Sequence, residues 1–110
     1  MSIKALKFAK DLVPLVLSGE KTSTWRLWDD KDIQAGDMVE LVGRPDLRVF
    51  AKGEIISVVK KPMGKLTTED KKGHETFDSD EQMYKTYTRY YKRPVDSNTL
   101  VKIIRFKLTG

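Results

Sequence analysis

The chain of 110 residues contains no cysteine and a single histidine, His74. The lack of cysteine excludes disulfide bonds, thiolate catalysis and cysteine-ligated zinc sites. One histidine cannot supply the cluster of histidines found in most metal centres. We therefore expect neither a metal ion nor another cofactor.

Long hydrophobic runs are also absent from the sequence. No apolar run approaches the roughly 20 residues needed to span a bilayer. The N-terminus lacks the apolar stretch and the cleavage site of a signal peptide. We expect a cytoplasmic protein that has no membrane partner.

Hydrophobic residues make up 39% of the chain and charged residues 34%, as in a soluble globular protein. This length suits one modest core, so we expect one domain over residues 1–110 and a monomer. The net charge of +5 favours anionic partners such as nucleic acid or nucleotides. The lysines are spread over the whole chain, however, and charge alone predicts solubility before it predicts a site.

The pattern of apolar residues predicts mixed secondary structure. A first strand is expected over Ile3 to Phe8, and then a short apolar helix that Asp11 caps and Gly19 ends. Pro14 fits the first turn of this helix, and its apolar composition predicts that it is buried. Strands follow over 23–28, 38–42 and 48–60, the last with a bulge or bend at Gly53, and a closing strand over 100–108. Helices are expected from Thr67 to near Gly73 and from Ser79 to Pro94.

These elements predict an α+β fold. Several short strands, a buried N-terminal helix and a helical insertion before the last strand indicate a small mixed β-barrel. A barrel of this size has no interior room for a ligand. We therefore expect the site in a surface cleft, between the Lys21 to Arg26 segment and the insertion around His74 to Tyr91.

The segment from Gly19 to Arg26 brings together two cationic and three hydroxyl side chains. Strand alternation places Thr24, Arg26 and Trp28 on one face, and Ser23, Trp25 and Leu27 on the other, with Trp25 and Leu27 as the better core pair. An amine three residues before a hydroxyl suits attack on a carbonyl or binding of a phosphate. Isolated matches of this kind are common, so two alternatives remain. Lys21 could be a solvated side chain, and Arg26 could form a structural ion pair with Glu75 or Asp29.

This segment also carries a family resemblance. The run from Leu17 to Arg26, with Gly36-Asp37 in the run Ile33 to Val39, resembles the G-x-K-x-x-T-x-R and later G-D signature of the ASCH domain. That family belongs to the PUA-like superfamily, and the likeness covers nearly the whole chain in order. The resemblance implies a single PUA-like β-barrel domain with a cleft suited to RNA or a modified nucleoside.

Within this family, the chain is similar to small bacterial amidohydrolases that remove the acyl group from N4-acetylcytidine. The resemblance implies a catalytic set of one lysine, one threonine and one glutamate. Lys21 and Thr24 match the first two by motif, and Glu75 is the best match for the third. Glu69 and Glu81 are alternatives for the glutamate.

The expected chemistry follows from the side chains. A threonine hydroxyl needs a base near neutral pH, and Lys21 can serve if burial and the neighbouring Arg26 lower its pKa. Glu75 would protonate the departing exocyclic nitrogen and later activate water. Alternatively, Thr24 positions a water molecule without forming an acyl intermediate.

The aromatic residues divide into two groups. Trp28 and Tyr90, together with Arg26, are the expected substrate-binding residues, because aromatic faces stack on bases. His74 is expected to be a loop residue rather than a general base. The helical spacing of three other tyrosines predicts that they dock the insertion helix onto the barrel: Tyr84, Tyr87 and Tyr91.

Two other functions remain open at this point. The same cleft suits a noncatalytic RNA-binding module, and the chain could also be a protein-interaction domain. A compact domain without tails favours the enzyme, since recognition modules are more often fused to other domains.

Overall fold

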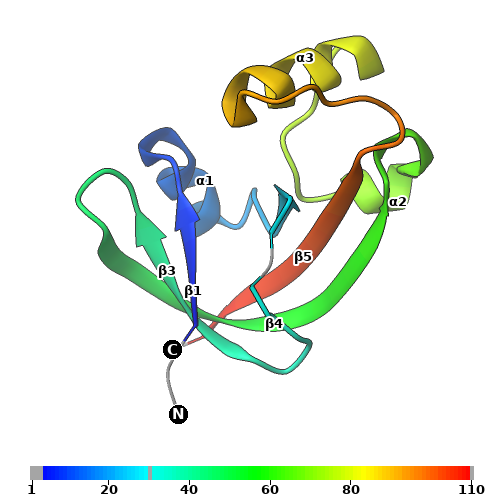
Figure 1. Ribbon diagram of the computed structural model, residues 1–110. Helices are drawn as coiled ribbons and strands as arrows, with labels where there is room; N and C mark the ends of the chain where they lie inside the picture. The colour runs from blue at the N-terminus through cyan, green and yellow to red at the C-terminus, as the bar shows by residue number, and fades with distance from the viewer. Residues whose placement is uncertain (1–3, 30, 110) are drawn as a thin grey trace.

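A computed structural model describes residues 4–29 and 31–109 of the chain (Figure 1). The predicted first strand is observed from Lys4, and Ile3 lies outside the described residues. Two 3₁₀ turns, Lys10–Leu12 and Met63–Lys65, separate some of the elements. In chain order the strands and helices are β1 (Lys4–Phe8), α1 (Val13–Ser18), β2 (Ser23–Leu27), β3 (Met38–Gly43), β4 (Arg48–Pro62), α2 (Thr68–Lys71), α3 (Asp80–Tyr91) and β5 (Leu100–Thr109).

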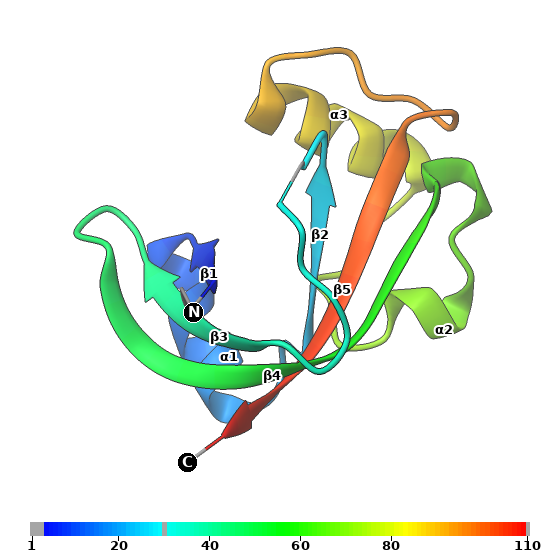
Figure 2. The same ribbon diagram turned by 60° about the horizontal axis from the view of Figure 1, so that its bottom comes forward.

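The described strands form one mixed sheet in the order β1-β3-β4-β5-β2. β1 pairs with β3 in parallel, and the other neighbours are antiparallel. The sheet is strongly curled, and the long strand β4 follows this curl (Figure 2). In the sequence, α2 and α3 lie between β4 and β5. The predicted α+β fold is confirmed in this coarser form: a curled half-barrel sheet with helices, consistent with a PUA-like fold.

The edge strands β1 and β2 are linked by a side chain. Arg26 Nη2 donates a hydrogen bond of 2.6 Å to the Lys7 carbonyl oxygen. Backbone pairing between these two edges is not seen in residues 4–29 and 31–109. The half-barrel therefore keeps an opening between β1 and β2, and Arg26 spans it.

Of the two features predicted at Gly53, a bulge or a bend, the bulge is not observed at this residue. Gly53 pairs in regular register with Val39 and Leu108, and the register of β4 against β5 shifts further along, between Ile55 and Ser57. A Cβ at position 53 would lie 2.9 Å from the Lys107 carbonyl oxygen. Close approach of the neighbouring backbone, rather than a bulge, is thus the reason for glycine here.

Helix α1 follows the prediction at its end and differs at its start. Gly19 ends the helix with a left-handed φ of 87°, and Pro14 sits in the first turn, as predicted. Asp11 does not cap the helix, because it lies inside the 3₁₀ turn and the N-cap is Leu12. The helix is not buried as a whole: Val16 is buried while Leu17 is 52% exposed, because one face of this short helix contacts the sheet.

Buried apolar side chains of the described residues gather in two clusters. The first joins the curled sheet to α1 and to Ile33. The second lies between α3 and the strands β2 and β5 and contains Trp25 and Leu27, the core pair predicted from strand alternation. The three tyrosines expected to dock the insertion helix pack against this second cluster: Tyr84, Tyr87 and Tyr91.

The insertion helices begin at side-chain caps. Thr67 and Asp70 form a capping box at α2, and the Ser79 hydroxyl accepts a hydrogen bond from the Gln82 N–H at α3. Both starts agree with the sequence prediction. None of the helices in the described part of the chain has the length and apolar character needed to cross a membrane.

We expect Gly53→Ala to destabilise the fold by about 1–3 kcal/mol, because the new methyl group must displace the backbone of β5. Urea unfolding monitored by circular dichroism measures the change. Gly43→Ala is the matched control, since its Cβ would lie 3.4 Å from a side-chain methyl of Val13, an ordinary contact. Equal stability of the two variants would contradict the proposed close approach.

Candidate active site

A cleft of about 320 Å³ opens where β1, β2, the loop before α3 and α3 meet. Its lining comes from segments far apart in the sequence: the end of β1 with the 3₁₀ turn after it, the turn after α1, β2, the loop residues His74, Glu75 and Phe77, and the inner face of α3. All three residues expected to be catalytic line it: Lys21, Thr24 and Glu75. The two walls expected from the sequence thus face a common cleft.

Lys21 enters the cleft from the turn that follows α1. The left-handed Gly19 ends the helix, and the Lys21 N–H then donates to the Leu15 carbonyl at 3.0 Å. The side chain of Lys21 is 4% exposed, and its Nζ donates to Glu75 Oε2 at 2.7 Å. Two residues 54 positions apart are thereby joined by a partly buried ion pair.

The local electrostatics shift the pKa values of this pair. Burial lowers the pKa of the Lys21 ammonium and nearby Arg26 lowers it further, although the bond to Glu75 acts in the opposite direction. Burial opposes ionisation of Glu75, but His74 and the Lys21 ammonium outweigh burial and hold the pKa of this carboxyl below its usual value. Glu75 is therefore a carboxylate near neutral pH, next to an amine that loses its proton more easily than usual.

Thr24 is bonded to Arg26 rather than to Lys21. Arg26 Nε donates to Thr24 Oγ1 at 3.1 Å, as expected for two residues on one face of β2. Among the described residues, Lys21 and Thr24 do not share a hydrogen bond, so the expected direct pair is not observed. Arg26 forms neither of the ion pairs considered from the sequence, with Glu75 or with Asp29, within residues 4–29 and 31–109.

His74 lines the cleft, in the wall expected from the sequence, but its contacts there were not anticipated. Its side chain is 4% exposed, and its ring stacks on Trp25 with centroids 3.8 Å apart. Nδ1 lies 3.2 Å from Glu75 Oε2 and 3.0 Å from the Glu75 carbonyl oxygen, while Nε2 lies 3.3 Å from the Tyr87 hydroxyl. Since both neighbours of Nδ1 are acceptors, Nδ1 carries the proton, and Nε2 accepts from Tyr87.

These contacts place the His74 ring directly against Glu75. Burial lowers the pKa of His74 to about 4, and the Lys21 ammonium contributes, so the ring is neutral at pH 7. The adjacency of His74 to Glu75 was the sequence signal for this contact. The stack on Trp25, which places the ring inside the cleft, is a contact that sequence spacing does not reveal.

The expected substrate-binding residues do not all reach the cleft. Arg26 and Tyr90 line it, but Trp28 lies outside. β2 ends at Leu27, and Trp28 has a φ of 51°, so strand alternation does not continue to this residue. The Arg93 guanidinium lies 3.9 Å from the centroid of the Trp28 ring and covers it.

The alternative glutamates also lie away from the cleft lining. Glu69 pairs with Lys72 at 3.0 Å and is exposed, and Glu81 is exposed in the first turn of α3. Glu75 is therefore the glutamate that the fold brings to Lys21. In the described part of the chain, no three histidine, aspartate or glutamate side chains come together as metal ligands would.

Comparison with known proteins relies on structure alone, because no family model and no curated protein matches the chain. An ASCH domain from Lactobacillus crispatus superposes with a TM-score of 0.76 at 17% identity, covering 97% of this chain and 79% of that one. The fold is that of ASCH domains. A mutant of ZmASCH from Zymomonas mobilis matches this ASCH fold with a TM-score of 0.68 at 12% identity, covering 94% and 67% of the two chains. A protein of Enterococcus faecalis matches with a TM-score of 0.79 at 17% identity, covering 99% and 82%.

We expect the buried neutral His74 to make stability fall with acidification. The ring takes up a proton near pH 6.5 in the unfolded chain and near pH 4 in the folded one, so the unfolded state binds more protons between these values. The free energy of unfolding should therefore drop by about 2 kcal/mol between pH 7 and pH 5. Urea titrations at both pH values measure this drop. In His74→Phe, which keeps an aromatic ring beside Trp25, the drop should be smaller by that amount, and an equal drop would contradict this role.

Proposed function

We propose that the protein is an amidohydrolase that removes the acyl group from N4-acylated cytosine nucleosides such as N4-acetylcytidine. The observation that carries the proposal is the 2.7 Å bond between buried Lys21 Nζ and Glu75 Oε2, in a cleft that Thr24 also lines. These are the side chains that the ASCH resemblance implies for this chemistry. The ASCH fold found by structural comparison is compatible with it.

The cleft suits a nucleobase in size and lining. Its volume of about 320 Å³ lies at the lower end for small-molecule sites. Trp25, Tyr87 and Tyr90 are among its lining residues. Aromatic faces of this kind stack on bases with about 1–3 kcal/mol per base. A cytosine ring is thus a good match for the aromatic wall, with its acyl group directed toward Thr24.

In the first step, the Thr24 hydroxyl attacks the acyl carbonyl and gives its proton to the neutral amine of Lys21. The lowered pKa of Lys21 supports this role, because it enlarges the neutral fraction of the amine near pH 7. The bond from Arg26 Nε to Thr24 Oγ1 stabilises negative charge that develops on this oxygen. The attack yields a tetrahedral intermediate on Thr24.

In the second step, the proton passes along the Lys21–Glu75 bond to the exocyclic nitrogen of the base. The C–N bond breaks, the free cytosine nucleoside leaves, and the acyl group stays on Thr24 as an ester. Glu75 then removes a proton from a water molecule, which attacks the ester. Glu75 returns this proton to Thr24 Oγ1 as the ester C–O bond breaks, which releases the carboxylic acid and restores the Thr24 hydroxyl. The net reaction consumes one water molecule per amide bond.

We expect purified protein to release acetate from N4-acetylcytidine. Lys21→Met and Thr24→Ala should each lower kcat/KM by at least about 100-fold, because each removes a group needed for bond formation. Chromatographic detection of cytidine measures turnover, and circular dichroism checks the fold. Lys52→Ala and Thr68→Ala are matched controls at exposed positions outside the cleft.

Undiminished turnover in both cleft variants would refute the assignment. If the protein shows no turnover and instead binds RNA in a salt-sensitive way, a noncatalytic RNA-binding module is the correct function, since phosphate contacts release counterions.

Mass spectrometry of acid-quenched reactions tests the covalent step. A chain carrying one acetyl group supports the Thr24 ester, whereas its absence during turnover favours direct attack by water.

The pH dependence of kcat/KM tests Lys21 as the base. We expect the rate to rise with pH as the Lys21 ammonium loses its proton, with a midpoint below the usual value of 10.5. Arg26→Gln should move this midpoint upward, because it removes a positive charge that lowers the pKa of Lys21. A midpoint that does not change in Arg26→Gln would contradict the electrostatic coupling.

A further inference from the structure

Three basic residues form a row across neighbouring strands. Arg26 on β2 is the register partner of Lys102 on β5, and Lys102 is the partner of Lys60 on β4. Partners in register point to the same face of a sheet. Like charges placed directly opposite each other destabilise a sheet, so this row needs a compensating interaction.

Two cations of the row, Lys102 on β5 and Arg26 on β2, lack a carboxylate partner among the described residues. Lys102 is 6% exposed, and its Nζ donates to the Lys31 carbonyl oxygen at 2.7 Å. Arg26 uses its Nε for Thr24 and its Nη2 for the Lys7 carbonyl.

Both cations retain donors for a ligand. An ammonium has three N–H groups and a guanidinium has five, so these side chains keep further N–H groups beyond the bonds they make. Buried charges are normally paired, because leaving them without a counter-ion is costly. A ligand that carries negative charge would therefore be a favourable partner for Arg26 and Lys102.

The row lines a second cavity of about 410 Å³. Lys60, Lys102 and Arg26 supply its positive charge, and Asn98 and Thr99 add polar groups. Among the described residues, Asp29 is the carboxylate in the lining, and its Oδ1 accepts from the Lys31 N–H at 2.9 Å. Positive charge thus exceeds negative charge in this cavity.

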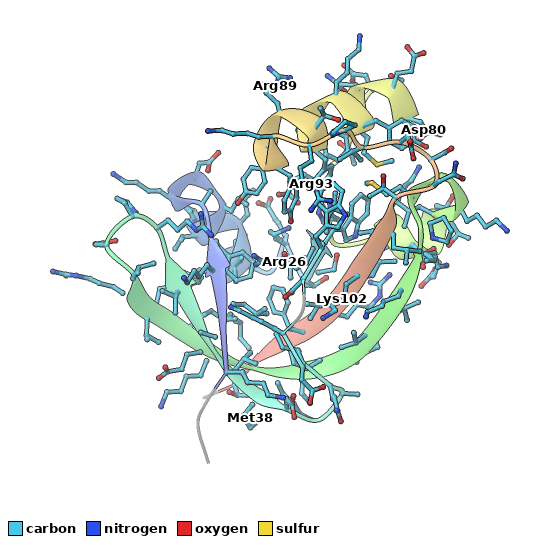
Figure 3. All side chains as sticks on the ribbon, in the orientation of Figure 1. Arg26, Met38, Asp80, Arg89, Arg93 and Lys102 are labelled. Carbon is cyan, nitrogen blue, oxygen red and sulfur yellow. The ribbon has the colours of Figure 1, made fainter. Side chains whose placement is uncertain are left out.

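Arg26 belongs to both cavities. It lines the cleft with Lys21, Thr24 and Glu75, and it also lines the second cavity with Lys102. Figure 3 shows Arg26 and Lys102 on the sheet beneath α3, with Arg93 near them in this view. A ligand whose reacting group lies beside Thr24 can therefore extend past Arg26 to the row of cations.

We infer that the second cavity binds a phosphate group of a nucleotide whose acylated base occupies the cleft. The identity of the base rests on the proposed function, whereas the phosphate site rests on the cations. A phosphate accepts hydrogen bonds on several oxygens at once, which matches the unused donors of Arg26 and Lys102. The phosphate belongs either to a mononucleotide or to the backbone of a single-stranded oligonucleotide.

The test compares the dissociation constants of three probes by isothermal titration calorimetry: cytidine, cytidine 5′-monophosphate and a short single-stranded oligocytidylate. We expect the monophosphate to bind at least about tenfold more tightly than cytidine, with a gain that shrinks as salt increases. Tighter binding of the oligocytidylate than of the monophosphate identifies a nucleic-acid backbone as the source. Equal dissociation constants for the oligocytidylate and the monophosphate identify a mononucleotide as the source of the phosphate.

Variants of the row test the site itself. Lys60→Ala and Lys102→Met should each reduce, several-fold, the gain in affinity that the phosphate gives to the monophosphate over cytidine. Lys52→Ala, which removes an exposed lysine from the same strand as Lys60, should keep the full gain. Lys60 is exposed, so its variant decides the question even if Lys102→Met, at a buried position, fails to fold.

Equal affinity for cytidine and its monophosphate in the unmodified protein would overturn the inference, as would a full gain in Lys60→Ala. The proposed function is judged separately by hydrolysis of N4-acetylcytidine. If the protein hydrolyses N4-acetylcytidine but binds the monophosphate no more tightly than cytidine, the phosphate site is refuted and the amidohydrolase stands. If the phosphate increases affinity through Lys60 but no hydrolysis occurs, the amidohydrolase is refuted and the phosphate site is supported.

Discussion

The bond between Lys21 and Glu75 is the interaction on which the candidate site depends. It joins the turn after α1 to the loop before α3, across 54 residues of sequence. The backbone supports the same contact, because the N–H groups of Thr22 and Ser23 both donate to the Gly73 carbonyl, at 2.9 and 3.1 Å. A buried ion pair often costs as much desolvation energy as it recovers in attraction. The pair is therefore weak evidence of a contribution to stability.

The open edge of the half-barrel provides the room for this site. Direct pairing of β1 with β2 would place a backbone ladder where the cleft now lies. Arg26 instead spans the two edges with one side chain, donating to the Lys7 carbonyl and to the Thr24 hydroxyl. The same guanidinium borders the second cavity. One arginine thus links the strand edges, the threonine and the row of cations.

Most element boundaries were predictable because local physics decides them. Gly19 ends α1 in a left-handed conformation, and Thr67 and Ser79 cap the next helices through their side chains. Alternation along β2 correctly assigned Trp25 and Leu27 to a core. The errors occurred where tertiary context prevails. Asp11 lies in a 3₁₀ turn and does not cap α1, and Gly53 marks the close approach of a neighbouring backbone rather than a bulge.

The sequence by itself determined the order of elements, the caps of α2 and α3, and the placement of Thr24 and Arg26 on one strand face, because these depend on residues only a few positions apart. The tertiary structure decided which glutamate meets Lys21, and it placed His74 inside the cleft and Trp28 outside it. It also aligned Arg26, Lys102 and Lys60 across three strands. Such pairings depend on strand register, on the curl of the sheet and on the path of the loop before α3, which no local pattern specifies.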